Sequence, residues 1–316
     1  MKTRVLTGVG LLAFMVLLFF TKSFTPYVFD AFLIYVAVVG GLEMSNILTK
    51  IGFFNSKIAV CVYPLLAYVL FKVCAYFKVS LYLVVVLQIA LIILISATVS
   101  LICLFAKKRS DNEIKTRKIN CTLEQFSLFK GVQSLFSLLY PAFILIFAIF
   151  INNIEDLKYI FVNVTDSTNI TSIFFLVFVF AIPIAVDTFA MLTGSIFKGK
   201  KLCEKISPAK TISGAIGGLV WGILCALALF FIFNSIDKYR VLFIALNLTW
   251  WKILIVGFIS SIMCQLGDLF ESFLKRKSGL KDSGDLLPGH GGVLDRIDSH
   301  LANIIVTFIF MLIVLL

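Results

Sequence analysis

Long apolar runs separated by short polar segments fill the whole 316-residue chain. Runs of about 18 or more apolar residues predict membrane-spanning helices, and we count about nine of them. They cover approximately residues 5–20, 27–45, 58–77, 79–106, 127–151, 172–194, 211–233, 248–266 and 299–316. We therefore expect an all-α, polytopic integral membrane protein with about nine transmembrane helices and no separate soluble domain.

The composition supports this interpretation. Hydrophobic residues make up 60% of the chain and charged residues only 14%, whereas a soluble domain has roughly 25% charged residues. The first apolar run follows Lys2 and Arg4, as in a signal peptide, but no small-residue cleavage site comes after it. We expect this run to be a retained membrane anchor.

The basic residues predict an orientation, because Lys and Arg are retained in cytoplasmic loops. If the N-terminus is cytoplasmic, 21 of the 28 Lys and Arg residues fall on the cytoplasmic side. They lie at Lys2, Arg4, Lys50 and Lys57 and in segments 107–130, 198–210 and 275–296. We therefore predict a cytoplasmic N-terminus and a C-terminus on the other side.

Two further classes of protein are excluded by composition. The net charge of +11 is explained by topology, so it does not indicate nucleic-acid binding, which would require a basic soluble module. The seven cysteines form no Cys-x-x-Cys pair, so neither a disulfide framework nor a zinc site is predicted.

The acidic residues are few and unevenly placed. Six of the 17 lie between Asp268 and Asp298, and another, Asp187, stands within an apolar run. An ionisable side chain at mid-span costs about 2.5–3.5 kcal/mol and is usually retained for a function. Pro183 should kink or end this helix, and a broken helix with a carboxylate typically lines a polar cavity. The alternative is that Asp187 is solvated near the cytoplasmic interface.

The segment 267–298 combines carboxylates, basic side chains and a glycine-rich turn. Asp268 and Ser272 are four residues apart and share a helix face, while Asp295 and Asp298 open the last span. Mg²⁺ binds few carboxylates and completes its shell with water and phosphate oxygens, and exposed backbone N–H groups of the turn can hold further phosphate oxygens. The pattern indicates metal-assisted phosphate chemistry, with a solvated loop of mixed charge as the alternative.

At these residues the chain resembles the phosphatidate cytidylyltransferase (CDP-diacylglycerol synthase) family. The family signature reads Ser-x-aliphatic-Lys-Arg, four residues, Lys-Asp-x-small, two residues, then aliphatic-Pro-x-His-Gly-Gly-aliphatic-x-Asp-Arg-aliphatic-Asp. Ser272 through Asp298 satisfies every position. Residues 126–316 are therefore expected to form the catalytic transmembrane region with cytoplasmic motif loops, and residues 1–125 a variable set of N-terminal transmembrane helices.

A second block, from Asp187 to Gly214, also resembles the family. The residues that match are Asp187, Ala190, Gly194, Leu202, Ser207, Pro208, Lys210, Thr211 and Gly214. The departures are Met191 for a usual Tyr, Ser195 for Arg or Lys, Ser213 for an acidic or amide residue, and the order Lys198-Gly199. Gly214, Gly218 and Gly222 form a separate pattern, a small-residue stripe that predicts close helix packing.

The resemblance implies a reaction and a set of roles. Phosphatidic acid attacks the α-phosphorus of CTP, giving CDP-diacylglycerol and pyrophosphate. The implied catalytic residues are Asp268, Asp295, Lys281 and Arg296. The implied metal ligands are Asp268 and Asp295, supported by Asp187 and Asp298. The implied substrate-binding residues are Ser207, Lys210, Thr211, Lys275, Arg276, Asp282, His290, Gly291 and Gly292, with a structural role for His290 as an alternative.

The implied cofactor is Mg²⁺, with a monovalent ion such as K⁺ beside it. The expected partners are CTP, phosphatidic acid and membrane lipids, with no nucleic acid, and a homodimer is left open. The expected location is the cytoplasmic membrane, with the active site facing the cytoplasm. Two rivals remain: a polyprenol kinase that transfers the γ-phosphoryl group of CTP, and a transporter that uses Asp187 as an ion site.

The two substrates also predict the depth of the site. CTP must stay in water and the acyl chains of phosphatidic acid in lipid, so their phosphates can meet only near the cytoplasmic headgroups. We expect a polar cavity that opens to the cytoplasm and sideways to the inner leaflet. Asp187, Asp268 and Asp295 should line it within roughly 10 Å of one another, with Lys210 close by.

Overall fold

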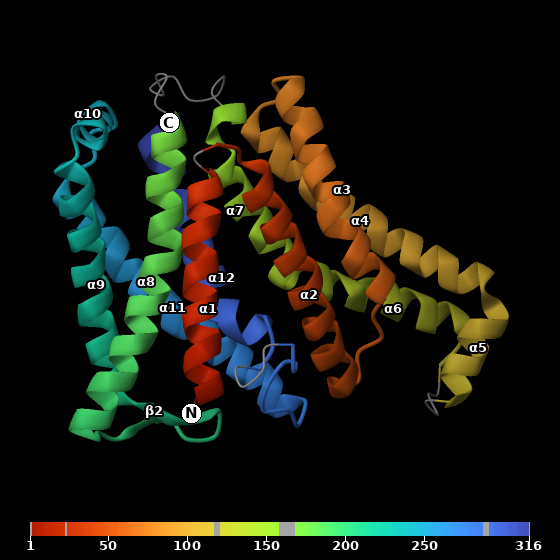
Figure 1. Cartoon of the computed structure of the whole chain (residues 1–316). Coiled ribbons are helices and arrows are strands. Elements are labelled where there is room, and N and C mark those ends of the chain that lie inside the picture. Colours follow the sequence, from red (N-terminus) through yellow and green to blue (C-terminus); the bar gives the residue numbers. More distant parts are fainter. Residues whose placement is uncertain (1, 23, 117–120, 158–167, 287–290, 316) are drawn as a thin grey trace.

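The computed structural model describes the chain except residues 1, 23, 117–120, 158–167, 287–290 and 316, and the described part is almost entirely helical (Figure 1). Its elements are α1 Lys2–Lys22, α2 Tyr27–Ile51, α3 Lys57–Tyr76, α4 Leu81–Phe105, α5 Lys107–Thr116, α6 Leu123–Ser137, the kinked segment η1 Leu138–Phe143, α7 Ile144–Asn152, the 3₁₀ turn η2 Ile154–Leu157, α8 Thr168–Phe197, β1 Lys201–Cys203, β2 Ser207–Thr211, α9 Ile212–Asn234, α10 Asp237–Ala245, α11 Trp250–Lys277 and α12 Leu294–Leu315.

Eight helical segments within the described residues are long and apolar enough to cross a membrane. They are α2, α3, α4, the kinked segment Leu123–Asn152 made by α6, η1 and α7, and α8, α9, α11 and α12. The first apolar run forms α1, of which Ala13–Lys22 is counted as a shorter apolar helix. These helices confirm the expected all-α membrane class. Helices suit a membrane because a chain in lipid must satisfy its backbone polar groups internally.

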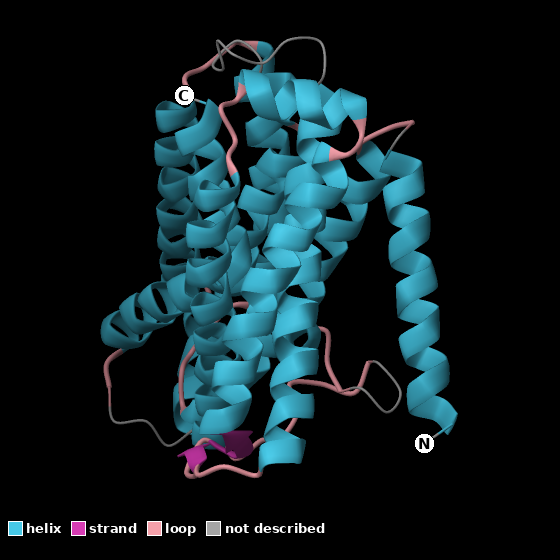
Figure 2. Ribbon diagram, turned by 90° about the vertical axis from the view of Figure 1, so that its left-hand side faces the viewer, coloured by secondary structure: helices cyan, strands magenta, loops and turns pink. Residues whose placement is uncertain are grey.

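The long helices run alternately up and down, so α1 begins at the lower end of the bundle and α12 ends at the upper end (Figure 1). The lower end also carries the α2–α3 connection, the β1–β2 hairpin and the loop between α11 and α12. Figure 2 shows the two strands confined to this end. The basic hairpin, the described part of segment 275–296 and the α2–α3 connection with Lys50 and Lys57 therefore lie at one end of the bundle, and the side of the membrane that this end faces stays a prediction.

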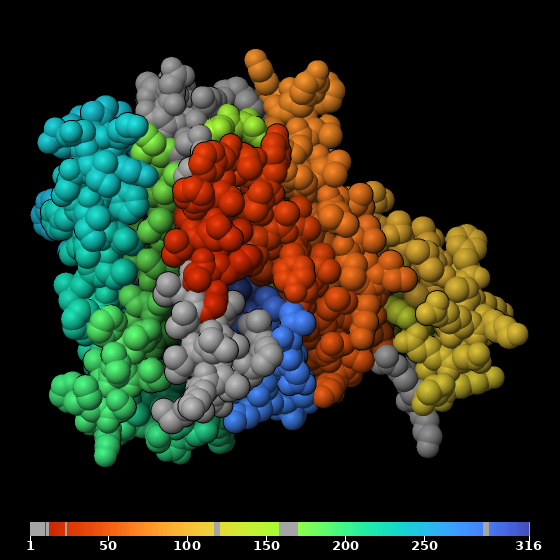
Figure 3. All heavy atoms as spheres, in the orientation of Figure 1, coloured from red at the N-terminus to blue at the C-terminus, as the bar shows by residue number. Residues whose placement is uncertain are grey.

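Helices α4, α5 and α6 lean away from the rest of the bundle and form an arm on one side (Figures 1 and 3). Within the arm, Ser96 Oγ donates to the carbonyl of Gly131 at 2.7 Å, and Ser127 Oγ donates to the carbonyl of Ser100 at 2.5 Å. A side chain at Gly131 would collide with Ser100. Small residues therefore let α4 and α6 approach closely.

Helices α8 and α9 pack through the predicted glycine stripe. Gly214, Gly218 and Gly222 are all buried on α9. A Cβ atom at Gly214 would lie 2.6 Å from the carbonyl oxygen of Ala190, and one at Gly218 would lie 3.0 Å from the carbonyl oxygen of Val186. The stripe brings the two helices of the second motif block side by side and confirms the predicted close packing.

A buried polar network joins α2, α3 and α7 toward the upper end. Asp30 is 1% exposed. Its carboxylate accepts hydrogen bonds from the amides of Asn152 and Asn153, each at 2.7 Å, and from the Tyr68 hydroxyl at 3.1 Å. Lys72 Nζ lies 2.7 Å from both Asn153 Oδ1 and Asp156 Oδ2. We call these six residues the upper network: Asp30, Tyr68, Lys72, Asn152, Asn153 and Asp156.

Candidate active site

The site begins at the β1–β2 hairpin, a segment for which the sequence predicted motif residues and basic charge but no strands. Its strands pair antiparallel, Lys201 opposite Thr211 and Cys203 opposite Ser207. Arg276, at the end of α11, donates through Nε to the carbonyl of Ile206 at 3.1 Å. The hairpin is thereby fixed against the helix that carries the first half of the signature.

The start of α9 is capped by Thr211. Its hydroxyl accepts a hydrogen bond from the Gly214 amide at 3.1 Å, as an N-cap residue does. Ser213, one of the departures from the family pattern, accepts the Gly199 amide at 3.2 Å and so ties the hairpin base to this turn. The N-terminus of a helix carries a partial positive charge that favours anions, and Thr211 and Gly214 both face a cavity.

That cavity has a volume of about 670 Å³ and lies between α8, α9, α11 and the hairpin. Its charged side chains come from different elements: Asp187 from α8, Asp268 from α11, and the lysines from the hairpin or the residues next to it. The lining residues are Asp187, Ala190, Met191, Gly194, Ser195, Lys198, Gly199, Lys201, Leu202, Ala209, Lys210, Thr211, Gly214, Ala215, Gln265 and Asp268. A cavity with three lysines and two carboxylates is suited to a polyphosphate and a cation.

Lys210 and Asp268 form an ion pair across the cavity, with Nζ 2.5 Å from Oδ2. Ser272 Oγ donates to the other oxygen, Oδ1, at 3.3 Å. The two charged side chains are 25% and 27% exposed. Ion pairs of this exposure contribute about 0–1 kcal/mol, so the pair can open for a ligand at small cost. The expected closeness of Lys210 to Asp268 is confirmed.

Asp187 is exposed to the cavity and connects the two motif blocks. Its Oδ2 accepts the Ser299 hydroxyl of α12 at 3.0 Å, and the Ser299 amide donates to Asp298 Oδ1 at 2.7 Å. Helix α8 continues through Pro183 to Phe197, so of the two expectations for this proline, a kink or an end of the helix, the second is wrong. The carboxylate reaches a polar cavity without a break in the helix, because the hairpin and α11 supply the polar walls.

Asp295 lies elsewhere. Its Oδ1 is 2.6 Å from Lys275 Nζ, and its Oδ2 accepts the amides of Ser283 and Gly292 at 2.9 and 2.8 Å. Lys275 also pairs with buried Glu271 at 2.7 Å. Asp295 is not among the described residues that line the cavity, whereas its expected distance of roughly 10 Å from Asp187 and Asp268 stays a prediction. Its oxygens hold the signature loop instead.

The other predicted residues lie around these two centres. Lys281, Asp282 and Arg296 are exposed on the signature loop and the first turn of α12, and Ser207 is half-buried in β2. Gly291 has a φ of 80° beside Asp295, where a side chain would also approach the Asp295 carboxylate within 2.6 Å. His290 lies outside the described residues.

A resident Mg²⁺ can be tested against this geometry. Among the described residues, no three or more His, Cys, Asp or Glu side chains are grouped to hold a metal ion. One carboxylate oxygen of Asp268 is paired with Lys210, and both carboxylate oxygens of Asp295 are bonded, one to Lys275 and the other to two backbone amides. Mg²⁺, however, needs only one or two carboxylates when waters and substrate phosphates complete its shell. Asp187 and Asp268, which face one cavity, fit that requirement.

Sequence reasoning missed three contributors. Gln265 lines the cavity, with its amide nitrogen bonded to the carbonyls of Ala215 and Ser261 at 3.2 and 3.3 Å. Ser299 bridges the two blocks. Glu43 of α2 bonds the signature loop from about 250 residues away. In the sequence, Glu43 stands out only as a carboxylate near the end of the apolar run 27–45.

Fold and site together define a polytopic helical membrane protein with a lysine- and carboxylate-lined cavity at one end of its bundle. Residues 2–314 match the model of the Cytidylyltransferase family. The chain belongs to that family.

Curated relatives carry a more specific name. The chain is similar to the phosphatidate cytidylyltransferase of Rickettsia conorii, with 44% identity over 131 residues, or 41% of this chain and 54% of that protein. The phosphatidate cytidylyltransferase of Rickettsia felis is 45% identical over 130 residues, covering 41% and 55% of the two chains. That of Staphylococcus haemolyticus is 40% identical over 135 residues, covering 43% and 48%. The chain thus aligns with about half the length of these relatives.

Proposed function

We propose that the protein transfers the cytidylyl group of CTP to phosphatidic acid, giving CDP-diacylglycerol and pyrophosphate. Membership of the Cytidylyltransferase family and similarity to phosphatidate cytidylyltransferases support this proposal. The observation that carries it is the cavity in which Lys198, Lys201 and Lys210 face Asp187 and Asp268. These are the groups that a nucleoside triphosphate with a divalent cation requires.

The chemistry suits this set of residues. A phosphate oxygen of phosphatidic acid forms a bond to the α-phosphorus of CTP, and the bond from that phosphorus to the β-bridging oxygen breaks. The attacking phosphate is already an anion, so no general base is needed. The lysines neutralise charge that develops on the departing pyrophosphate, and the cavity walls hold the reactants in line.

Asp187 and Asp268 would hold the Mg²⁺ ion of this site, and when bound the ion supplies further neutralisation of phosphate charge. Asp298 supports this pair because it accepts a hydrogen bond from the amide of Ser299, whose hydroxyl donates to Asp187. Asp295 acts through the signature loop. A monovalent ion such as K⁺ stays a prediction of the family resemblance.

The cavity walls also support access from the lipid. Met191 lines the cavity and is 68% exposed, and Leu202 lines it from the hairpin. Apolar groups at the boundary let the acyl chains remain in the membrane while the phosphate enters. With the basic segments at the same end of the bundle, we assign this opening to the cytoplasmic leaflet.

The test is an assay of purified protein with Mg²⁺, vesicles that contain phosphatidic acid, and CTP labelled at either the α- or the γ-phosphorus. The α label should appear in the lipid product. The γ label should be released as pyrophosphate and should not appear in lipid. Entry of the γ label into a lipid acceptor, with CDP released, would identify a kinase instead. Vesicles with diacylglycerol in place of phosphatidic acid are the control and should yield no product.

A further inference from the structure

Glu43, in the lower half of α2, is a buried carboxylate with no place in the proposed chemistry. It is 7% exposed. Its Oε1 accepts the amide of Val293 at 3.0 Å, and its Oε2 accepts the amide of Leu294 at 2.7 Å and the hydroxyl of Ser283 at 3.0 Å. A carboxylate is buried at acceptable cost only when it is hydrogen-bonded in this way. All three donors belong to the signature segment.

Two signature glycines make room for this carboxylate. A Cβ atom at Gly284 would lie 2.6 Å from Glu43 Oε1, and its three nearest atoms would all belong to Glu43. A Cβ atom at Gly292 would lie 2.5 Å from Glu43 Oε2. The spacing of small residues in this segment is therefore matched to a side chain of the N-terminal helices.

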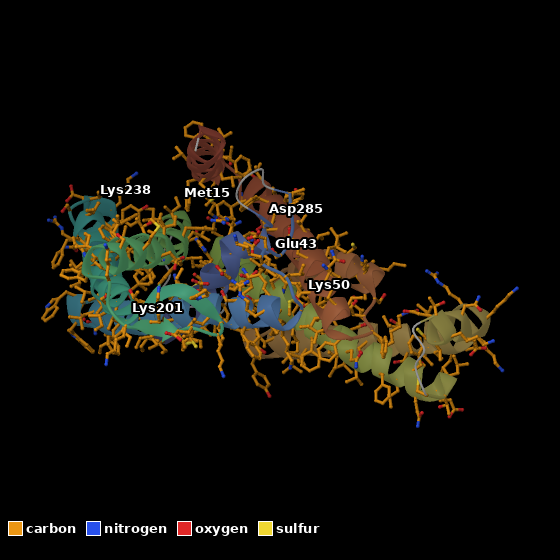
Figure 4. The ribbon with its side chains drawn as sticks, turned by 90° about the horizontal axis from the view of Figure 1, so that it is seen from below. Met15, Glu43, Lys50, Lys201, Lys238 and Asp285 are labelled. Carbon is orange, nitrogen blue, oxygen red and sulfur yellow. The ribbon has the colours of Figure 1, made fainter. Side chains whose placement is uncertain are left out.

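The bonded amides are those at the start of α12, where unpaired N–H groups and the helix dipole favour a negative group. Asp295 holds the same segment from the other side through the amides of Ser283 and Gly292. Two carboxylates thus fix both ends of the loop at its base. Figure 4, viewed from the lower end, shows Glu43 beside this loop, close to Asp285.

We propose that Glu43 is a positioning residue of the active site. It fixes the base of the signature loop and the first turn of α12, and thereby the placement of Asp295, Asp298 and Ser299. This inference rests on the proposed cytidylyl transfer. Glu43 is not among the described residues that line the cavity, so its loss should lower turnover and leave CTP binding by the hairpin lysines nearly unchanged.

The first experiment compares Glu43→Gln and Glu43→Ala with the wild type. Both variants should speed hydrogen exchange at the Val293 and Leu294 amides. The kcat per folded protein should fall about tenfold in Glu43→Ala and less in Glu43→Gln, which keeps one acceptor, while KM for CTP stays within about twofold. Glu113→Gln, which alters a half-buried ion pair in the arm, is the control and should change neither quantity.

A second variant covers the case in which Glu43→Ala does not fold. Gly284 has a φ that other residues adopt, so Gly284→Ala should fold and displace the carboxylate, with kcat reduced about threefold or more. The double variant Glu43→Ala/Gly284→Ala should be no slower than Glu43→Ala, because the added methyl group then meets no carboxylate. Multiplied losses in the double variant would overturn the inference.

The outcomes separate this inference from the proposed function. A wild-type protein with no transfer from CTP to phosphatidic acid would refute the proposed function, and with it the positioning role. An active wild type whose kcat is unchanged in Glu43→Gln and in Gly284→Ala would refute the role of Glu43 alone. Faster exchange at Val293 and Leu294 with unchanged kcat would also refute it, because a purely structural bond would give that result.

Discussion

The cavity at the lower end and the upper network use the same residue types in opposite ways. In the upper network, Asp30 is 1% exposed and three side chains donate to its carboxylate. In the cavity, Asp268 is 27% exposed and paired with a lysine that is 25% exposed. In the upper network the carboxylate of Asp30 accepts its hydrogen bonds from protein side chains, whereas in the cavity the partly exposed Asp268 and Lys210 can also bind a ligand.

The energetics follow from this difference. Removing one partner of a buried ionic cluster leaves charge and donors uncompensated and costs about 3–5 kcal/mol. Breaking a partly exposed pair such as Lys210–Asp268 costs about 0–1 kcal/mol. We therefore expect substitutions in the upper network to change stability and substitutions in the cavity to change function.

The largest effect is expected for Asp268→Asn. Transfer from CTP to phosphatidic acid should fall at least about 100-fold, because the site loses a carboxylate that would hold Mg²⁺ beside the phosphates. Thermal unfolding in detergent should change little. Turnover per folded protein, measured over a range of Mg²⁺ concentrations, checks the prediction. Near-normal turnover would show that Asp268 takes no part in the chemistry.

Asp30→Ala should show the reverse behaviour. The amides of Asn152 and Asn153 lose their acceptor, so the protein should lose about 3 kcal/mol of stability. The kcat of the fraction that remains folded should stay within about twofold of the wild type. Thermal unfolding followed by size-exclusion chromatography measures the first quantity. A tenfold loss of kcat with unchanged unfolding would make the upper network part of the functional site.

Lys210→Met should change substrate affinity. It removes a positive charge from the cavity and keeps most of the apolar stem, so KM for CTP should rise about tenfold. Stability should change by less than about 1 kcal/mol, as for other exposed pairs. Steady-state kinetics at saturating phosphatidic acid provide the test, and an unchanged KM would place the triphosphate away from this lysine.

Lys198→Gly should have the smallest effect, a small gain in stability and a small loss in affinity for CTP. Lys198 has a φ of 44°, a left-handed conformation that costs a non-glycine residue roughly 1–2 kcal/mol. Glycine should therefore raise the thermal midpoint, and loss of a cavity lysine should raise KM for CTP slightly. A lower midpoint would show that the lysine side chain stabilises the end of α8.

The sequence predicted the helices well because lipid imposes regular helices on long apolar runs. It did not predict the hairpin, since β1 and β2 are only three and five residues long and include lysine, proline and alanine, which give little strand signal. Asp187, Asp268 and Lys210 were recognised through local motif patterns, and the structure brings them to one cavity. The position of Asp295 and the bonds of Glu43 depend on contacts between distant segments, which leave no local pattern.

The central claim is that the two motif blocks form one site, with Asp187 from one block and Asp268 from the other. The most direct measurement is kcat/KM for labelled CTP in Asp187→Asn, Asp268→Asn and the double variant. If both carboxylates serve one site, kcat/KM should fall at least about 100-fold in each single variant. In the double variant, kcat/KM should be less than about tenfold below that of the less active single variant. Near-normal activity of Asp187→Asn, or a double variant whose loss equals the product of the two single losses, would contradict the claim.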